Sequence, residues 1–199
     1  MSKSYSGFTF DDLKDIGIQY SFKSLVFSER LINPSEQLKT NLEIANRLPI
    51  NTETAKSQLI TAPILNEIMK NNDFRITYYA GYIFDVEKSK GLKGYCDFIL
   101  TKTPNSPIVE DPIFCMVEAK RDNVDNGIAQ CAAEMVAAQI FNERRGNDTK
   151  IIHGAVTSGF EWLFLRLDGN FVSIDTKRYY LNNLSELLGV LQDIVDFYK

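Results

Sequence analysis

Hydrophobic residues recur along the chain with two different periods, and these periods predict its helices and strands. Apolar residues spaced three and four apart predict helices over residues 34–48, 52–72, 124–144 and 184–195. Short runs rich in β-branched and aromatic residues predict strands over residues 74–84, 94–100, 113–120, 151–159, 161–167 and 171–177. Pro63 lies inside the second helix, where a proline favours a kink or a fresh start.

The order of these elements predicts the fold class. It runs helix, three strands, helix, strand, hairpin and helix, which is typical of an α/β fold with helices flanking a mixed sheet. With 199 residues and no repeat or linker, the chain is expected to form one domain, 1–199. Within it we expect a peripheral N-terminal helical arm over residues 1–50, a core over 52–157, and a C-terminal hairpin and helix over 158–199.

Composition narrows the class of protein without identifying it. The net charge of -4 argues against a general nucleic-acid coat protein but leaves room for an enzyme with a local basic patch. No apolar run approaches the ~18–20 residues of a membrane span, and we expect no secretory signal. Cys96, Cys115 and Cys131 form no C-x-x-C pair and are expected to be reduced, buried residues of a cytoplasmic protein. The single histidine, His153, argues against a zinc site and is expected to be a hydrogen-bonded strand residue.

Acidic residues in two successive predicted strands form the candidate site. Glu118 and Lys120 share a face of strand 113–120, because side chains alternate along a strand. Asp97 lies within the apolar run Y-C-D-F-I-L, where an aspartate is disfavoured. If the two strands are neighbours, Asp97 and Glu118 can converge on one cation, and hard oxygen ligands suit Mg²⁺ or Mn²⁺. The alternative is a buried ion pair that closes the edge of the sheet.

The acid-x-lysine pattern alone is weak evidence, because it occurs four times, beginning at Asp12, Glu118, Asp148 and Asp175. The pattern at Asp175 is the serious rival, since it also ends an apolar strand. Its upstream partner would be Asp168, which is typical of a D-G turn. Only Glu118 follows both a strand-embedded aspartate and a helix that carries a glutamate.

Together these features resemble the PD-(D/E)XK nuclease superfamily, which includes restriction endonucleases and the nuclease domains of DNA-repair enzymes. Residues 52–157 follow its core order of helix, three strands, helix and strand. Asp97 matches the first motif acid, although Cys96 stands where many members have proline, and residues 118–120 match the E-x-K motif in full. The resemblance therefore implies a restriction endonuclease-like core.

The resemblance also implies roles for the motif residues. Asp97 and Glu118 would hold one or two Mg²⁺ ions, with the carbonyl of Ala119 as a further ligand. The metal would lower the pKa of water and neutralise charge on the scissile phosphate. Lys120 would orient or help deprotonate the attacking water, or stabilise developing negative charge.

Two helix residues complete the set that the resemblance implies. Glu67 matches the acid that many members carry on the helix before the strands, and would act on the metal directly or through water. Gln130 resembles a glutamine that some branches place after E-x-K, and would support the metal ligands from behind. For both, the alternative is an ordinary residue on a helix surface.

The segment T-S-G-F-E-W-L-F, which starts at Thr157, resembles a T-N-G-x-x-W-x-F stretch. That stretch follows the nuclease core in the N-terminal domain of type I restriction motor subunits and their stand-alone relatives; here Ser158 replaces the asparagine. We interpret Phe160, Trp162 and Phe164 as core residues rather than as a platform for stacking bases.

The expected function is phosphodiester hydrolysis by a metal-dependent DNA endonuclease of a restriction or defence system. The choice of DNA rests on the resemblance alone, and a Holliday-junction resolvase or a repair exonuclease would use the same centre. The alternative from another class is a nuclease-like fold that binds nucleic acid or assembles with a partner without catalysis. The sequence contains no recognition or motor domain, which favours a protein partner, and homo-oligomers are also compatible with it.

Overall fold

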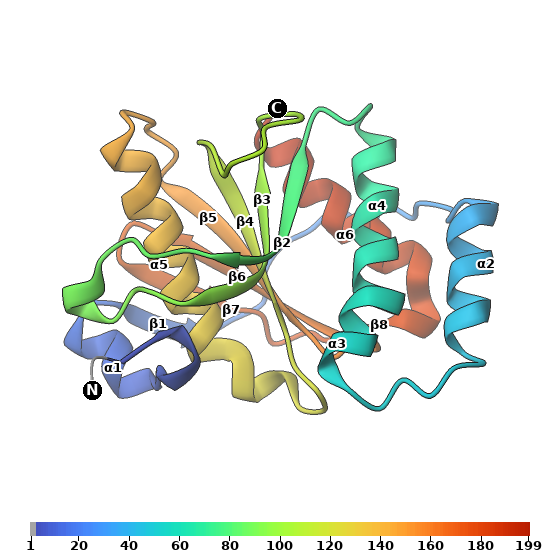
Figure 1. Cartoon of the computed structure of the whole chain (residues 1–199), viewed down its shortest axis with the longest axis horizontal. Coiled ribbons are helices and arrows are strands. Elements are labelled where there is room, and N and C mark those ends of the chain that lie inside the picture. Colours follow the sequence, from blue (N-terminus) through green and yellow to red (C-terminus); the bar gives the residue numbers. More distant parts are fainter. Residues whose placement is uncertain (1–2) are drawn as a thin grey trace.

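The computed structural model describes residues 3–199 and has one mixed β-sheet at its centre (Figure 1). Its strands are β1 (Gln19–Phe22), β2 (Thr77–Ile83), β3 (Tyr95–Thr101), β4 (Ile113–Ala119), β5 (Ile151–Thr157), β6 (Glu161–Asp168), β7 (Phe171–Ile174) and β8 (Tyr179–Tyr180). Their order is β1-β7-β6-β5-β4-β3-β2, and β8 pairs with β6. The pairs β4·β5 and β1·β7 are parallel, and the others are antiparallel.

Helices cover both faces of this sheet (Figure 1). The α-helices are α1 (Phe10–Asp15), α2 (Glu36–Ala45), α3 (Glu53–Lys56), α4 (Ala62–Asn71), α5 (Ile128–Arg144) and α6 (Leu184–Phe197). Short 3₁₀ helices lie at η1 (Tyr5–Gly7), η3 (Lys88–Lys90), η4 (Val124–Gly127) and η5 (Leu181–Asn183), and η2 (Ser57–Thr61) is a π-helical turn. One core lies under α1 and α5, and a second lies under α2, α4 and α6. The predicted α/β class with a mixed sheet flanked by helices is confirmed.

Helix α5 packs on β4 and β5 through small residues. Ala132, Ala133 and Ala137 are fully buried, so the helix backbone can approach the sheet closely. Gly154 of β5 faces the helix with no room for a side chain: a methyl group there would meet the sulfur of Met135 and lie 2.9 Å from the sulfur of Cys131. This tight contact fixes the helix that follows the E-x-K motif.

The helix before the strands is built in three pieces. Thr52 caps α3 by accepting a hydrogen bond from the Ala55 amide at 3.1 Å. The π-helical turn η2 follows, and α4 continues from it with Pro63 in its first turn. Thr61 and Ala62 before it have αR backbone angles, so the helix continues through Pro63 without a break. The fresh start is therefore not observed, and the irregularity beside Pro63 is a π-helical turn within one helix.

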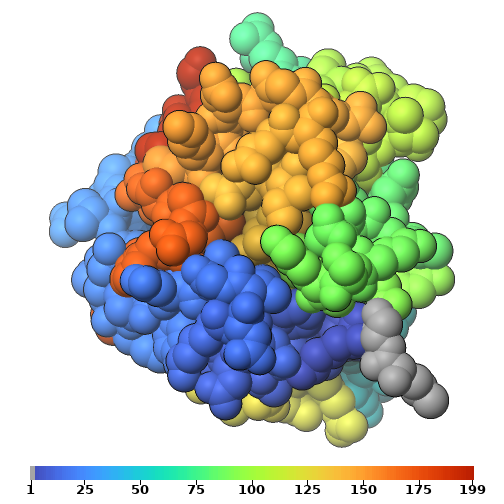
Figure 2. All heavy atoms as spheres, turned by 90° about the vertical axis from the view of Figure 1, so that its left-hand side faces the viewer, coloured from blue at the N-terminus to red at the C-terminus, as the bar shows by residue number. Residues whose placement is uncertain are grey.

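The N-terminal segment is more deeply built into the fold than the expected peripheral arm. β1 adds an edge strand beside β7, and Tyr5 is fully buried. The Tyr5 hydroxyl donates to the carbonyl of Phe84 at 2.7 Å, and its amide donates to that of Lys93 at 3.0 Å. Figure 2 shows this blue segment against the green 84–94 loop.

Several structural expectations for single residues are confirmed. All three cysteines are buried and unpaired. His153 is a buried strand residue whose Nδ1 lies 2.7 Å from the Tyr198 hydroxyl, and burial lowers its pKa to about 4. Trp162 is a core residue, but Phe160 is 41% exposed, so its assignment to the core was wrong. Between residues 3 and 199, no helix has the length and apolar character needed to cross a membrane.

Candidate active site

The end of β4 carries a buried acid and a lysine on one side of the strand. Glu118 is 2% exposed, and Lys120 forms an ion pair with its carboxylate. The Lys120 Nζ also donates to Oε1 of Gln130 on α5 at 3.0 Å. The Lys120 amide donates to the carbonyl of Thr157 at 2.7 Å, which continues the parallel pairing with β5 and fixes the lysine backbone.

Asp97 reaches the same place from β3. The antiparallel register sets Phe98 opposite Val117. Asp97, which precedes Phe98, therefore lies beside Glu118, which follows Val117. The Asp97 Oδ2 accepts a hydrogen bond from the Ala119 amide at 2.8 Å, which holds the carboxylate against the end of β4. Asp97, Glu118, Lys120 and Gln130 are thus brought together as the sequence predicted.

Another buried polar residue, Glu134, was missed by the sequence reasoning. It lies one helical turn after Gln130 on α5, is fully buried, and accepts a hydrogen bond from Gln130 Nε2 at 3.1 Å. A glutamate inside the small, apolar run A-A-E-M-V-A-A was the available signal, because such a position faces the sheet. Among the described residues, neither Oε2 of Glu134 nor Oε2 of Glu118 has a hydrogen-bond partner.

The buried acids perturb one another. Burial, together with the charges of Glu134 and Asp97, raises the pKa of Glu118 well above its ordinary value, although Lys120 opposes the shift. Burial raises the pKa of Glu134 to about 8. The two glutamates therefore retain a proton between them at neutral pH.

Lys120 remains charged in this environment. Burial lowers its pKa, but the charges of Glu118, Glu53 and Asp97 outweigh burial, and the net shift is upward. The pKa shifts of the two partners conflict. The raised pKa of Lys120 requires an ionised Glu118, whereas the raised pKa of Glu118 favours its neutral form. One proton shared between Glu118 and Glu134 reconciles them, because the ionised carboxylate can then face the ammonium group.

Glu67 is not part of this cluster. Its Oε1 accepts from the Ser35 amide and its Oε2 from the Ser35 hydroxyl, each at 2.7 Å, so both oxygens secure the start of α2. The expected metal-binding role of Glu67 therefore lacks support. A glutamate on an apolar helix face can serve a neighbouring helix start as well as a metal, and the sequence does not separate the two.

The helix contributes a different acid, Glu53, which the sequence reasoning overlooked. Its charge acts on Lys120, and it lines a cavity together with Asp97. Fourteen residues separate Glu53 from Glu67, which is about 21 Å along a helix at 1.5 Å per residue. The signal was Thr52, a good capping residue, which places Glu53 in the first helical turn at the end nearest the site.

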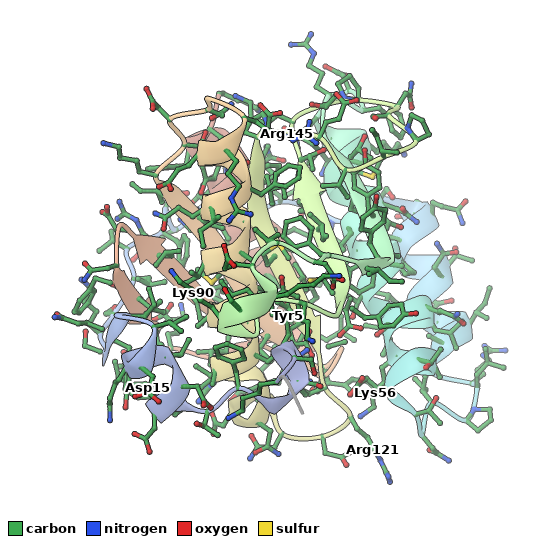
Figure 3. The ribbon with its side chains drawn as sticks, turned by 60° about the vertical axis from the view of Figure 1, so that its left-hand side comes forward. Tyr5, Asp15, Lys56, Lys90, Arg121 and Arg145 are labelled. Carbon is green, nitrogen blue, oxygen red and sulfur yellow. The ribbon has the colours of Figure 1, made fainter. Side chains whose placement is uncertain are left out.

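Basic residues lie at the mouth of the site, where α3 meets the loop after Lys120. The Lys56 ammonium donates to the carbonyl of Arg121, forms an ion pair with Asp122 at 3.7 Å, and sits 5.6 Å from the centre of the exposed Phe160 ring. Figure 3 shows Lys56 and Arg121 side by side at this end of the molecule. The lysine thus ties the helix to the loop that follows the E-x-K motif.

The T-S-G segment forms the turn from β5 to β6 beside this mouth. The Thr157 hydroxyl donates to the Glu161 carbonyl at 2.9 Å and accepts from the Gly159 amide at 2.8 Å. Gly159 has a φ of 83°, a conformation that favours glycine. Trp162 Nε1 donates back to the Gly159 carbonyl at 3.3 Å. The motif residues therefore shape a turn, which accounts for them without a direct chemical role.

The rival motif at Asp175 has a structural explanation. Asp175 is buried, and its Oδ1 accepts from the amides of Leu25 at 3.2 Å and Lys177 at 3.0 Å. Lys177 forms a separate ion pair with Glu186 on α6 at 2.5 Å. Asp175 and Lys177 therefore hold the 23–35 segment and the start of α6, and they form no acid-lysine site.

The donor set fits a hard divalent cation only in part. Residues 3–199 contain no group of three or more His, Cys, Asp or Glu side chains arranged to hold a metal. Mg²⁺, however, is commonly bound through one or two carboxylates together with water and substrate phosphate. Asp97 and Glu118 supply two such carboxylates, and Oε2 of Glu118 is a buried acceptor whose one partner is the proton that Glu118 and Glu134 share. The residues present fit Mg²⁺ or Mn²⁺ on this ground.

Comparisons with known proteins add no family assignment. No protein-family model matches the chain, and no curated protein matches it.

Proposed function

We propose that this chain is a metal-dependent nuclease of the PD-(D/E)XK type. The observation that carries the proposal is the convergence of Asp97, Glu118 and Lys120 at one end of β3 and β4, with buried acceptor atoms left unpartnered. The element order α3–α4, β2–β3–β4, α5 and β5 agrees with the core expected of that superfamily. By the same resemblance, the proposed substrate is DNA and the proposed context is restriction or defence.

The proposed reaction is hydrolysis of a phosphodiester bond. A water oxygen attacks phosphorus, the bond to the leaving sugar oxygen breaks, and that oxygen takes up a proton. Asp97 and Glu118 would hold Mg²⁺ or Mn²⁺, with the Ala119 carbonyl as a further ligand, and the bound cation would supply Lewis-acid charge. Lys120 offers a permanent positive charge toward the phosphate. Gln130 positions the lysine through its hydrogen bond to Nζ.

Metal-dependent cleavage tests this proposal. Purified protein is incubated with plasmid, linear, single-stranded and branched DNA in the presence of Mg²⁺, Mn²⁺ or EDTA. We expect cleavage that requires metal and falls about 10²-fold or more in Asp97→Asn, Glu118→Gln and Lys120→Ala. Lys150→Ala, an exposed lysine of another acid-x-lysine pattern, is the matched control and retains activity. Equal cleavage by all variants, or cleavage in EDTA, contradicts the proposal.

The second candidate is a nuclease-like module that binds nucleic acid or a partner without catalysis. One observation favours it: Lys120 is already engaged by Glu118 and Gln130, in a described region without a three-ligand metal cluster. Isothermal titration with MgCl₂ and MnCl₂ separates the two candidates. If the chain is a nuclease, it binds the metal, and Asp97→Asn weakens that binding. If it is the non-catalytic module, its binding of nucleic acid is equal with and without metal.

A further inference from the structure

A cavity of about 330 Å³ opens beside the Asp97 carboxylate. One wall comes from the helix before the strands, with Glu53 and its neighbours, and the opposite wall comes from β2 and β3. Its complete lining is Glu53, Thr54, Ser57, Gln58, Ala62, Ala80, Gly81, Asp97 and Phe98. Its volume lies at the lower end of the roughly 300–1,000 Å³ range of small-molecule sites.

The local sequence keeps this space open. Ala80 and Gly81 stand on β2 where every other residue from Tyr78 to Ile83 is large. Gly81 lies across from Asp97 in the antiparallel register, has a φ of 61°, and has no atom within 4 Å of where a side chain would begin. On the helix side, the π-helical turn Ser57–Thr61 widens the backbone before α4 begins. π-helical turns frequently occur at functional sites.

The chemistry of the lining selects a neutral group with a hydrogen-bonding edge. Within residues 3–199, the side chains of Thr54, Ser57 and Gln58 have no protein hydrogen-bond partner, and Phe98 supplies an apolar surface. No lysine or arginine lines the cavity, whereas Glu53 and Asp97 do. A phosphate inside would meet two carboxylates, but a base with its amide-like edge would meet hydroxyls and a carboxamide.

The charged residues at and near the cavity indicate which way such a ligand would enter. Glu53 and Asp97, which line the cavity, are also the acids whose charges act on Lys120. Asp97 accepts a hydrogen bond from the amide of Ala119, the residue before Lys120, so the Asp97 end of the cavity is the end nearest the lysine. A nucleotide entering base first would place its phosphate near Lys120.

We propose that this cavity receives one unpaired nucleotide adjacent to the scissile phosphate, so that the substrate class is single-stranded nucleic acid or duplex with a frayed or flap end. A base pair is too large for a cavity of this size and carries a backbone at each end. Entry from a duplex would require flipping, which costs a few kcal/mol and is cheapest for a base that is already unpaired. The inference rests on the proposed function for the scissile phosphate.

The test compares one sequence presented as a single strand, as a duplex with a single-stranded flap, and as a blunt duplex, cleaved with Mn²⁺. Ala80→Phe fills the cavity from an exposed position of an edge strand, where an aromatic residue is a good strand former. Ile83→Phe makes a matched change on the same strand outside the cavity. Gln58→Ala removes the carboxamide from the exposed helix face.

We expect at least tenfold faster cleavage of the single strand and the flap than of the blunt duplex. Ala80→Phe should raise KM for the single strand at least tenfold, Gln58→Ala should raise it several-fold, and Ile83→Phe should leave it unchanged. Equal cleavage of all three substrates, or an unchanged KM in Ala80→Phe, overturns the inference and leaves the nuclease standing.

Binding in EDTA, measured by fluorescence anisotropy of a labelled single strand, separates the two ideas if nothing is cleaved. Binding that Ala80→Phe weakens and Ile83→Phe does not would support the nucleotide cavity while the nuclease proposal fails. Binding that is absent, or equal in wild type and Ala80→Phe, overturns the cavity.

Discussion

The buried glutamate on α5 makes a prediction about stability that does not depend on activity. Glu134 is fully buried, one of its oxygens has no partner within residues 3–199, and burial raises its pKa to about 8. We predict that Glu134→Gln stabilises the protein at pH 8 much more than at pH 5. Glutamine keeps the shape and an acceptor for Gln130 but cannot ionise.

The sign follows from proton linkage. The unfolded chain releases the Glu134 proton near pH 4.5, whereas the folded protein keeps it to about pH 8. Between these values the folded state binds more protons, so the free energy of unfolding falls as pH rises, by up to about 1.4 kcal/mol per pH unit for one proton. Below about pH 4.5 both states are protonated and this loss is absent.

Urea unfolding in EDTA at pH 5, 6, 7 and 8 measures the effect. The stability difference between Glu134→Gln and wild type should grow by several kcal/mol over this range. Glu143→Gln, on the exposed end of the same helix, is the control and should show a constant difference. A difference for Glu134→Gln that does not change with pH would refute the argument that this carboxyl is held protonated by the fold.

Three glycines give further predictions. Gly154→Ala places a methyl group against the Met135 sulfur and should lower the free energy of unfolding by about 1–3 kcal/mol, seen as a lower urea midpoint. Gly189→Ala places its methyl group into the backbone carbonyl of Arg30; we expect a similar loss, with faster proteolysis of the 23–35 segment than in wild type. Gly127→Ala places its methyl group 2.6 Å from the buried Val156 side chain and 3.0 Å from the Lys120 side chain, so both the melting temperature and cleavage should fall, and unchanged cleavage would contradict the proposed lysine role.

Periodicity predicted most of the sheet and the long helices, because each of them buries one regular face. It missed α1 and β1, since these are short and their burial depends on the distant residues of β7 and α5. The Thr9-Asp12 capping box that starts α1 was a readable local signal. Phe160 was assigned to the core by its neighbours, but the left-handed turn at Gly159 moves it outward.

The residues of the candidate site also differ in how well the sequence predicts them. Asp97, Glu118 and Lys120 were predictable because a charged residue inside an apolar strand is conspicuous in a sequence. Glu53 and Glu67 show the limit, because choosing between two acids on one helix requires knowing which end of the helix meets the strands. Position along the helix axis is a tertiary property that neither spacing nor composition contains.

The alternative of a buried ion pair accounts for only part of this site. A pair that merely closes a sheet edge would match one acid to one base and satisfy the remaining polar atoms, since unsatisfied buried groups are costly. Here three carboxylates, Asp97, Glu118 and Glu134, act on one ammonium group, that of Lys120, and two of them share a proton because burial and mutual repulsion disfavour full ionisation. The excess negative charge lies beside a cavity that small residues keep open. An arrangement that costs stability and lies beside an open cavity is typical of a functional site, and this is the ground on which we propose a cation and a phosphate as its ligands.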